Sequence, residues 1–197
     1  MSTHQSPLLP PLTFQPLTPE HWDAFETLFG ERGACGGCWC MFWRRPRAEF
    51  LKGKGAGNRR AMQALVRGGT EPGILAFARD EPVGWCAVAP REEYLALGRS
   101  RILKAVDDTP VWSVSCLFVA KEYRKRGVSV ALLRAVIDFV AERGGRVVEG
   151  YPVEPKSPAM PAAFAWTGLA TAFLRAGFHE HRRGSPTRPI MRYDIDQ

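Results

Sequence analysis

The sequence predicts a single α+β domain built on a mixed β-sheet. Three observations support this prediction. The chain has 197 residues and is 45% apolar, which suffices for one substantial core and is too apolar for a disordered chain. Several short segments rich in β-branched and aromatic residues are separated by turn residues. One of them, Val111–Val119, leads into a long amphipathic helix and then into another strand, as a parallel crossover connection requires.

The N-terminal part predicts an edge strand and a helix. Leu12–Gln15 alternates between apolar and polar residues, and Pro16 closes this short strand. Thr18–Glu20 then supplies a capping hydroxyl, a proline and an acid, which together begin a helix. Gly30 ends that helix.

The next part predicts a loop, a second helix and a hairpin. Residues 31–57 are rich in glycine, arginine and aromatic residues, and we expect them to be irregular. A helix should run from Asn58 to about Val66 before two glycines stop it. Gly73–Arg79 and Val83–Ala89 predict two hairpin strands, and a short helix is expected over Arg91–Leu97.

The second half of the chain carries the clearest elements. The strand Val111–Val119 contains no breaker, and the helix that follows has a wide apolar stripe. The remaining predicted elements are the helix Val128–Glu142, the strand Arg146–Val153, a helix around Leu169–Ala176 and the closing strands Phe178–Arg182 and Pro189–Asp194. No internal repeat or linker divides this order, so we expect an N-terminal arm over residues 1–10 and one domain over residues 11–197.

The charge balance points to an anionic partner without identifying it. The 27 Lys and Arg residues exceed the 20 Asp and Glu residues, and the formal net charge is +7. A nucleic acid, an acidic lipid surface and a phosphorylated cofactor fit this charge, and so does a basic surface with no such partner. No uncharged apolar run approaches the roughly 18 residues of a spanning helix, so no contact with a membrane interior is expected.

The cysteines and the N-terminus predict a cytoplasmic protein. Five cysteines cannot all pair within one chain. The first residues lack the basic start and apolar middle of a signal peptide. We therefore expect reduced thiols in the cytoplasm.

The most informative stretch is Tyr123–Ser129, which lies between a predicted strand and a helix N-terminus. The first turn of a helix has unsatisfied N–H groups and a partial positive charge, so it attracts phosphate. Gly127 would let the backbone approach the anion closely, and three basic residues precede it. The spacing fits neither a Walker A loop nor the dinucleotide fingerprint. A basic turn that only caps a helix is the alternative.

This stretch resembles the signature of the GNAT N-acetyltransferase superfamily, Arg/Gln-x-x-Gly-x-Gly/Ala. Arg124, Gly127 and Ser129 stand at its defined positions, and serine departs from the usual last residue. Leu117–Val119 precedes the turn as the family's strand end does, and Ala176–Phe178 is similar to its late Gly-Phe corner. The resemblance implies a GNAT-like mixed, mostly antiparallel sheet with a parallel splayed pair at its centre and helices on both faces.

The resemblance also implies acetyl-CoA as the cofactor. Backbone amides of the turn would bind the pyrophosphate, and the end of the preceding strand would pair with the pantetheine arm in the gap between the splayed strands. The residues implied at the cofactor are Leu117, Phe118, Val119, Arg124, Lys125, Arg126, Gly127, Val128, Ser129 and Phe173.

Direct attack of an amine on the thioester needs a neutral amine, a stabilised oxyanion and a proton for the thiolate. A backbone N–H near Val119 could stabilise the oxyanion. In many family members a tyrosine donates the proton from the position that Phe173 holds here. Glu149 is the candidate base because a charge in an apolar strand must be paired or used, and Tyr151 on the same face could donate the proton. The alternatives are a Glu149 that faces solvent or pairs with an arginine, and a Tyr151 at the edge of the core.

A loop with the pattern Cys35-x-x-Cys38-x-Cys40 is interleaved with aromatic residues. Zinc requires four ligands, and no fourth is evident, so we predict no metal site and expect thiols packed among aromatic rings. The resemblance implies that this segment lines the acceptor pocket. Trp39, Phe42 and Trp43 are therefore candidate substrate contacts, and an aromatic wall suits an apolar or cationic acceptor.

These observations predict an acetyl-CoA-dependent N-acetyltransferase that acts on a primary amine of a small molecule, or on a protein amine. Two alternatives stay open: a CoA-binding protein with little catalysis, and a nucleic-acid-binding module supported by charge alone. No nucleic acid partner is expected, and a homodimer is left open.

Overall fold

The computed structural model describes residues 9–155 and 164–195. Its seven-stranded sheet has the order β1-β2-β3-β4-β5-β7-β6. The strands are β1 (Leu12–Pro16), β2 (Gly73–Ala78), β3 (Glu81–Pro90), β4 (Trp112–Val119), β5 (Val147–Gly150), β6 (His179–Ser185) and β7 (Arg188–Asp194). The helices are α1 (Trp22–Phe29), α2 (Arg47–Lys52), α3 (Ala56–Arg67), α4 (Val128–Ala141) and α5 (Ala170–Ala176).

Neighbouring strands are antiparallel except for the central pair β4 and β5, which are parallel. The predicted mixed, mostly antiparallel sheet is therefore confirmed. No helix among the described residues is long and apolar enough to cross a bilayer.

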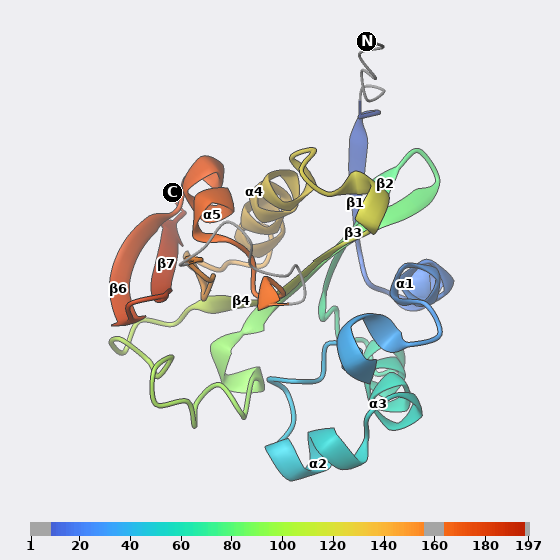
Figure 1. The fold of residues 1–197 in the computed structure, drawn as a ribbon, viewed down its shortest axis with the longest axis horizontal. Coiled ribbons are helices and arrows are strands. Elements are labelled where there is room, and N and C mark those ends of the chain that lie inside the picture. Colours follow the sequence, from blue (N-terminus) through green and yellow to red (C-terminus); the bar gives the residue numbers. More distant parts are fainter. Residues whose placement is uncertain (1–8, 156–163, 196–197) are drawn as a thin grey trace.

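Helices cover both faces of the sheet, because side chains alternate along each strand. On β2, Ile74 and Ala76 contribute to the core beneath α4 and α5. Leu75 lies between them in sequence and contributes to a second core beneath α1 and α3. Figure 1 shows these two groups of helices on opposite sides of the sheet.

The helix α4 holds the sheet's central strands together. Its buried stripe includes Leu132, Leu133 and Val136, which are fully covered by the strands and by α5. Burying each such side chain contributes about 1.5–3 kcal/mol relative to exposure. The turn before this helix is therefore fixed in position by a large apolar contact.

The central pair β4 and β5 separates after a short contact. Pairing joins Trp112 to Val148, Ser113 to Glu149 and Val114 to Gly150. The strand β5 ends at Gly150, but β4 continues to Val119. The expected splay is therefore present, and it lies directly before the turn that leads into α4.

The structure differs from the sequence-based elements at three places. The short helix α2 lies within the segment expected to be irregular, where Phe50 is buried and anchors it. The helix expected over Arg91–Leu97 is only a 3₁₀ turn, Arg91–Glu93, because Tyr94 turns inward and is fully buried. The strand expected to reach Val153 ends at Gly150, shortly before Pro152, which cannot donate a ladder hydrogen bond. Most of the predicted N-terminal arm lies outside the described residues.

Candidate functional site

The turn between β4 and α4 presents the N-terminus of a long helix. Gly127 is the residue before Val128, the first residue of α4, and it adopts a left-handed conformation with φ 87°. A Cβ at Gly127 would meet nothing within 4 Å, so the space above this residue is open. A glycine is favoured here because other residues rarely adopt the left-handed conformation. Ser129 follows in the first turn of the helix.

Basic side chains surround this helix end. Arg124 and Lys125 are exposed, and Lys125 has a positive φ of 60°. The guanidinium of Arg126 lies 5.5 Å from the centre of the Tyr123 ring. The N–H groups at the helix end, together with these cations, make the turn a site suited to a phosphate group.

The edge of β4 that faces the splay is engaged within the chain. The Leu117 N–H donates a hydrogen bond of 2.7 Å to the carbonyl oxygen of Trp166. Two residues on, the Val119 carbonyl accepts a hydrogen bond of 3.0 Å from Nε of Arg124. Since alternate residues present backbone groups to the same edge, both contacts lie where a ligand would pair with β4.

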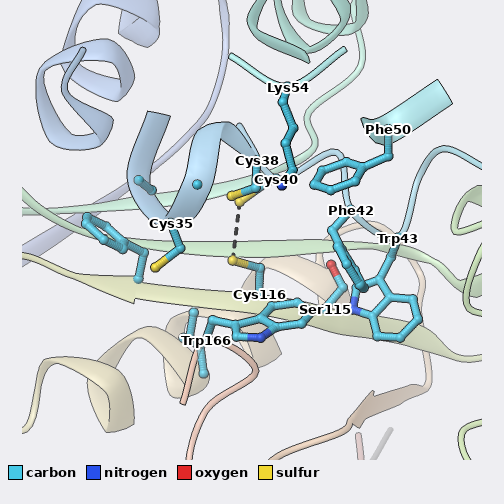
Figure 2. A pocket seen from close by; sticks show the side chains of 14 residues that line it. Cys35, Cys38, Cys40, Phe42, Trp43, Phe50, Lys54, Ser115, Cys116 and Trp166 are labelled. Carbon is cyan, nitrogen blue, oxygen red and sulfur yellow. Dashed lines mark hydrogen bonds between the residues drawn. The ribbon is translucent and has the colours of Figure 1, made fainter. Parts of the chain in front are cut away.

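A cavity of about 320 Å³ opens beside this edge. It lies between β4 and the segment that joins α1 to α3 (Figure 2). Its lining residues are Ala34, Cys35, Gly36, Cys38, Cys40, Phe42, Trp43, Phe50, Lys54, Ser115, Cys116, Leu117, Phe118 and Trp166.

One wall of the cavity is aromatic, with Phe42 at its centre. The Phe42 ring centroid lies 5.2 Å from that of Phe50, 4.9 Å from that of Trp43 and 4.9 Å from that of Trp166. The Trp43 Nε1 is buried and has no hydrogen-bond partner among the described residues. Figure 2 shows this nitrogen on the side of the ring that faces Ser115.

The other wall carries thiols. The sulfur atoms of Cys40 and Cys116 lie 3.3 Å apart, and the Trp85 Nε1 donates to the Cys40 sulfur at 2.9 Å (Figure 2 draws the sulfur contact). Burial raises the pKa of Cys40 well above its ordinary value. The hydrogen bond with Cys40 lowers the pKa of Cys38 to about 7. Within residues 9–155 and 164–195, no three His, Cys, Asp or Glu side chains form a group that could hold a metal ion.

Glu149 is buried in a charged network on the same side of the sheet as Ser113. Its Oε1 accepts hydrogen bonds from the Tyr151 hydroxyl at 2.7 Å and from Nη1 of Arg91 at 3.2 Å. Its Oε2 accepts one from Nε of Arg192 at 2.8 Å. Both carboxylate oxygens are thus engaged, and the residue is 1% exposed. The ion pairs of Glu149 with Arg91 and Arg192 match the alternative expected from the sequence, in which Glu149 pairs with an arginine and is not a catalytic base.

The Tyr151 hydroxyl belongs to the same network. It lies 2.8 Å from the Ser113 hydroxyl, and it contacts Arg91 as well. Burial, followed by the charge of Glu149, raises its pKa well above the ordinary value. Neither Tyr151 nor Glu149 lines the cavity.

Two further candidate residues lie in the cores. Trp39 is 4% exposed and stacks on Phe29 of α1, with ring centroids 5.6 Å apart, so it is not a wall of the cavity. Its backbone has a positive φ of 43°. Phe173 on α5 is fully buried. Its ring packs so closely on Gly150 of β5 that a Cβ at Gly150 would overlap it.

Other residues of this region have no distinctive signal in the sequence. Phe50 and Lys54 belong to the segment expected to be irregular, and the predicted strand gives no reason to choose Cys116. Trp166 follows a proline-rich stretch of the sequence that carries no periodic pattern. Arg91 and Arg192 reach Glu149 from distant parts of the chain, so no local spacing signals the network.

Comparison with known proteins gives a consistent result. The family model described as Acetyltransferase (GNAT) family matches residues 39–161. No curated protein matches the chain. Solved structures that resemble it share the fold at low sequence identity. The acetyltransferase GNAT family protein of Streptococcus agalactiae is 13% identical, with 94% of this chain and 96% of that chain covered and a TM-score of 0.55.

Two named enzymes are among the similar structures. The PaiA N-acetyltransferase of Thermoplasma acidophilum, solved with coenzyme A, is 12% identical, with 94% of this chain and 99% of that chain covered and a TM-score of 0.52. The ribosomal-protein-S18-alanine N-acetyltransferase of Escherichia coli is 14% identical, with 95% and 96% covered and a TM-score of 0.51. At these identities the likeness concerns the fold.

Proposed function

This chain belongs to the GNAT acetyltransferase family, and we propose that it transfers an acetyl group from acetyl-CoA to the primary amine of a small molecule. Membership of the family makes the chain an acyltransferase and acetyl-CoA its donor, which supplies the acetyl group as a thioester. A protein amine is the variant acceptor. The coenzyme A bound to the Thermoplasma relative supports the same donor.

The observation that carries the proposal is the turn between β4 and α4. Its glycine has the left-handed φ of 87° that exposes the end of the helix, and three basic residues precede it. A Cβ at this glycine would point into open space, so the residues present fit a bound pyrophosphate. We assign the phosphates to the backbone amides of Arg124–Ser129.

The pantetheine arm is assigned to the edge of β4 at Leu117–Val119. Backbone groups of Leu117 and Val119 face the splay, where an amide-containing ligand can pair with them. The Val119 N–H is proposed to stabilise the oxyanion. The acceptor is assigned to the neighbouring cavity, where Phe42 and Trp43 form the wall.

A second candidate function is a CoA-binding protein with little catalysis. Phe173 cannot donate a proton, and both oxygens of Glu149 are engaged. Loss of a general acid or base costs about 10²–10⁴-fold in rate, so weak activity would follow if nothing replaced them.

One experiment separates the two functions. Coenzyme A binding is measured by calorimetry, and acetylated products of an amine panel are detected by mass spectrometry. The proposal predicts that coenzyme A binds. It also predicts a product in which an acetyl group replaces one hydrogen of the amine, with the corresponding increase in mass. Binding without any product would favour the second candidate, and absence of binding would overturn both.

A further inference from the structure

The cavity beside β4 has an unusual charge for an amine site. Among the described residues that line it, Lys54 is the one side chain that is fully charged at pH 7, the Cys38 thiol is partly ionised there because its pKa is lowered to about 7, and no carboxylate is present. Figure 2 shows Lys54 extending toward the thiol wall. The other titratable groups that face the cavity are the thiols of Cys35, Cys38, Cys40 and Cys116.

An alkylamine meets two obstacles in this cavity. At neutral pH it is an ammonium ion with a pKa near that of lysine, about 10.4. Moving this ion into an apolar cavity without a carboxylate partner is costly, and the Lys54 charge adds repulsion. The ammonium must also lose a proton before it can attack a thioester.

The one buried carboxylate among the described residues is not available as a base for that proton. Glu149 gives one oxygen to Arg91 and Tyr151 and the other to Arg192. An acceptor that is already neutral at pH 7 removes this requirement. Aromatic amines are weak bases and carry no charge at that pH.

The walls of the cavity fit such a ring. Phe42 lies 4.9 Å from Trp43 and 5.2 Å from Phe50 between ring centroids, the spacing at which aromatic rings pack. The Trp43 Nε1 is buried and has no partner among the described residues, so a ligand in the cavity could accept its hydrogen bond only after a small shift of the ring. The Lys54 ammonium would attract an anionic group on the ring.

We propose that the acceptor is an uncharged aromatic amine that carries an anionic group, of the aminobenzoate class. This inference rests on the proposed function, because the same cavity must receive the acetyl group. In the transfer, the amine nitrogen forms a bond to the acetyl carbon and the carbon–sulfur bond of the thioester breaks. One amine proton ends on the sulfur of coenzyme A, so no oxidant or further reactant is needed.

Four amines of similar size test the two features of the proposal separately. Aniline and para-aminobenzoate are weakly basic, while benzylamine and para-(aminomethyl)benzoate are ammonium ions at pH 7. We expect the two aromatic amines to have at least tenfold higher kcat/KM than their alkylamine counterparts at pH 7. We expect para-aminobenzoate to exceed aniline, mainly because it binds more tightly.

Lys54→Gln tests the anionic group, and Lys52→Gln is the matched control. Lys52 is exposed on α2 and does not line the cavity. For para-aminobenzoate, K54Q should raise the Michaelis constant about 2–5-fold, as expected for an exposed ion pair, and for aniline it should leave the constant unchanged. K52Q should change neither. Quenching of tryptophan fluorescence by para-aminobenzoate, without acetyl-CoA, gives a binding constant that should follow the same pattern.

Several results would overturn the inference. They are an equal or higher kcat/KM for benzylamine than for aniline, a carboxylate that weakens binding, and turnover of peptide amines alone. In each case acetyl transfer from acetyl-CoA would still occur, so the acetyltransferase function would stand, and turnover of peptide amines alone would move it to the variant acceptor, a protein amine. A protein that binds no coenzyme A would end both proposals.

Discussion

The carboxylate of Glu149 meets two guanidinium groups, and this pairing explains how a charged residue is accommodated inside an apolar strand. Arg192 also binds Asp107 through two hydrogen bonds of 2.7 and 3.0 Å. These hydrogen bonds hold the pKa of Asp107 well below its usual range. The chain of charges ties β5 to β7 and to the loop before β4, so we expect its main contribution to be structural.

Replacement of Glu149 separates a structural role from a catalytic one. Glu149→Gln leaves the buried Arg192 and the half-buried Arg91 without the Glu149 carboxylate, while Arg192 keeps Asp107. We expect this change to reduce the free energy of unfolding by about 3–5 kcal/mol. The kcat of the folded protein should fall less than tenfold, whereas loss of a general base would lower it about 10²–10⁴-fold. Urea unfolding and steady-state kinetics at pH 7 measure the two effects.

Glu142→Gln is the control for this comparison. Its side chain is 74% exposed at the end of α4, so the change should alter the free energy of unfolding by less than about 0.5 kcal/mol. A kcat loss above a hundredfold in E149Q, with stability unchanged, would make Glu149 the base.

Cys38 should ionise at lower pH than Cys35. Because its pKa is lowered to about 7, it is mostly thiolate above that pH and mostly thiol below it. Alkylation by iodoacetamide should therefore increase through a midpoint near pH 7. Burial, with the charge of Cys38, raises the pKa of Cys35, so its alkylation should increase only at higher pH. Peptide mass spectrometry between pH 5.5 and 9 measures both rates, and a shared midpoint would contradict the thiol geometry.

At the scale of elements, the splayed edge of β4 is the feature on which cofactor binding depends. In the structure the Trp166 carbonyl and the Arg124 side chain take the hydrogen bonds of that edge. A pantetheine arm that pairs with Leu117 must replace the Trp166 contact. The segment 164–169 is therefore expected to move away from β4 when acetyl-CoA binds.

Hydrogen exchange tests this displacement. Acetyl-CoA should increase amide exchange in a peptide that covers residues 164–169, because a segment that has left β4 holds its own turn, with the Gly168 N–H donating to the Ala165 carbonyl, less firmly. A peptide from β6 (His179–Ser185), at the far edge of the sheet, serves as the control and should not change. Stronger protection of residues 164–169 would mean that the segment stays on β4.

The elements that the sequence predicts well are those with local signals. Gly127 stands between a breaker-free strand and an amphipathic helix, and the turn forms where this pattern places it. The end of β5 is harder to predict because the apolar pattern continues past Gly150, while Pro152 interrupts the ladder. The helix α2 escapes prediction because the glycines around it mask a short helical stretch.

The candidate site is less predictable because its residues come together from distant segments. Trp43 and Phe42 are expected at the acceptor pocket, and both line the cavity. Trp39, from the same loop, stacks on Phe29 of α1 instead. A pattern of aromatic residues alone does not say which ring faces which way. Lys54 and Trp166 become neighbours of the cavity only through the fold.

For the whole molecule, many arginines are paired within the chain, and these pairs leave the net charge of +7 unchanged. Ion pairs join arginines to acids in both halves, as between Arg59 and Glu26, Arg143 and Glu71, and Arg183 and Glu180. The exposed cations Arg124 and Lys125 at the α4 turn remain suited to a phosphorylated ligand. A homodimer and the single domain over residues 11–197 stay predictions.

Coenzyme A binding to variants of Gly127 tests the central assignment most directly. Gly127→Asp places a carboxylate where the pyrophosphate is expected, and Gly144→Asp is its control at the other end of α4. Gly144 also has a positive φ, 73°, with no atom within 4 Å of an added Cβ, so both variants carry a similar conformational cost of about 1–2 kcal/mol. By isothermal titration calorimetry, G127D should bind coenzyme A at least tenfold more weakly than the natural protein, and G144D should bind it equally well. Equal affinity of G127D and the natural protein would contradict the account.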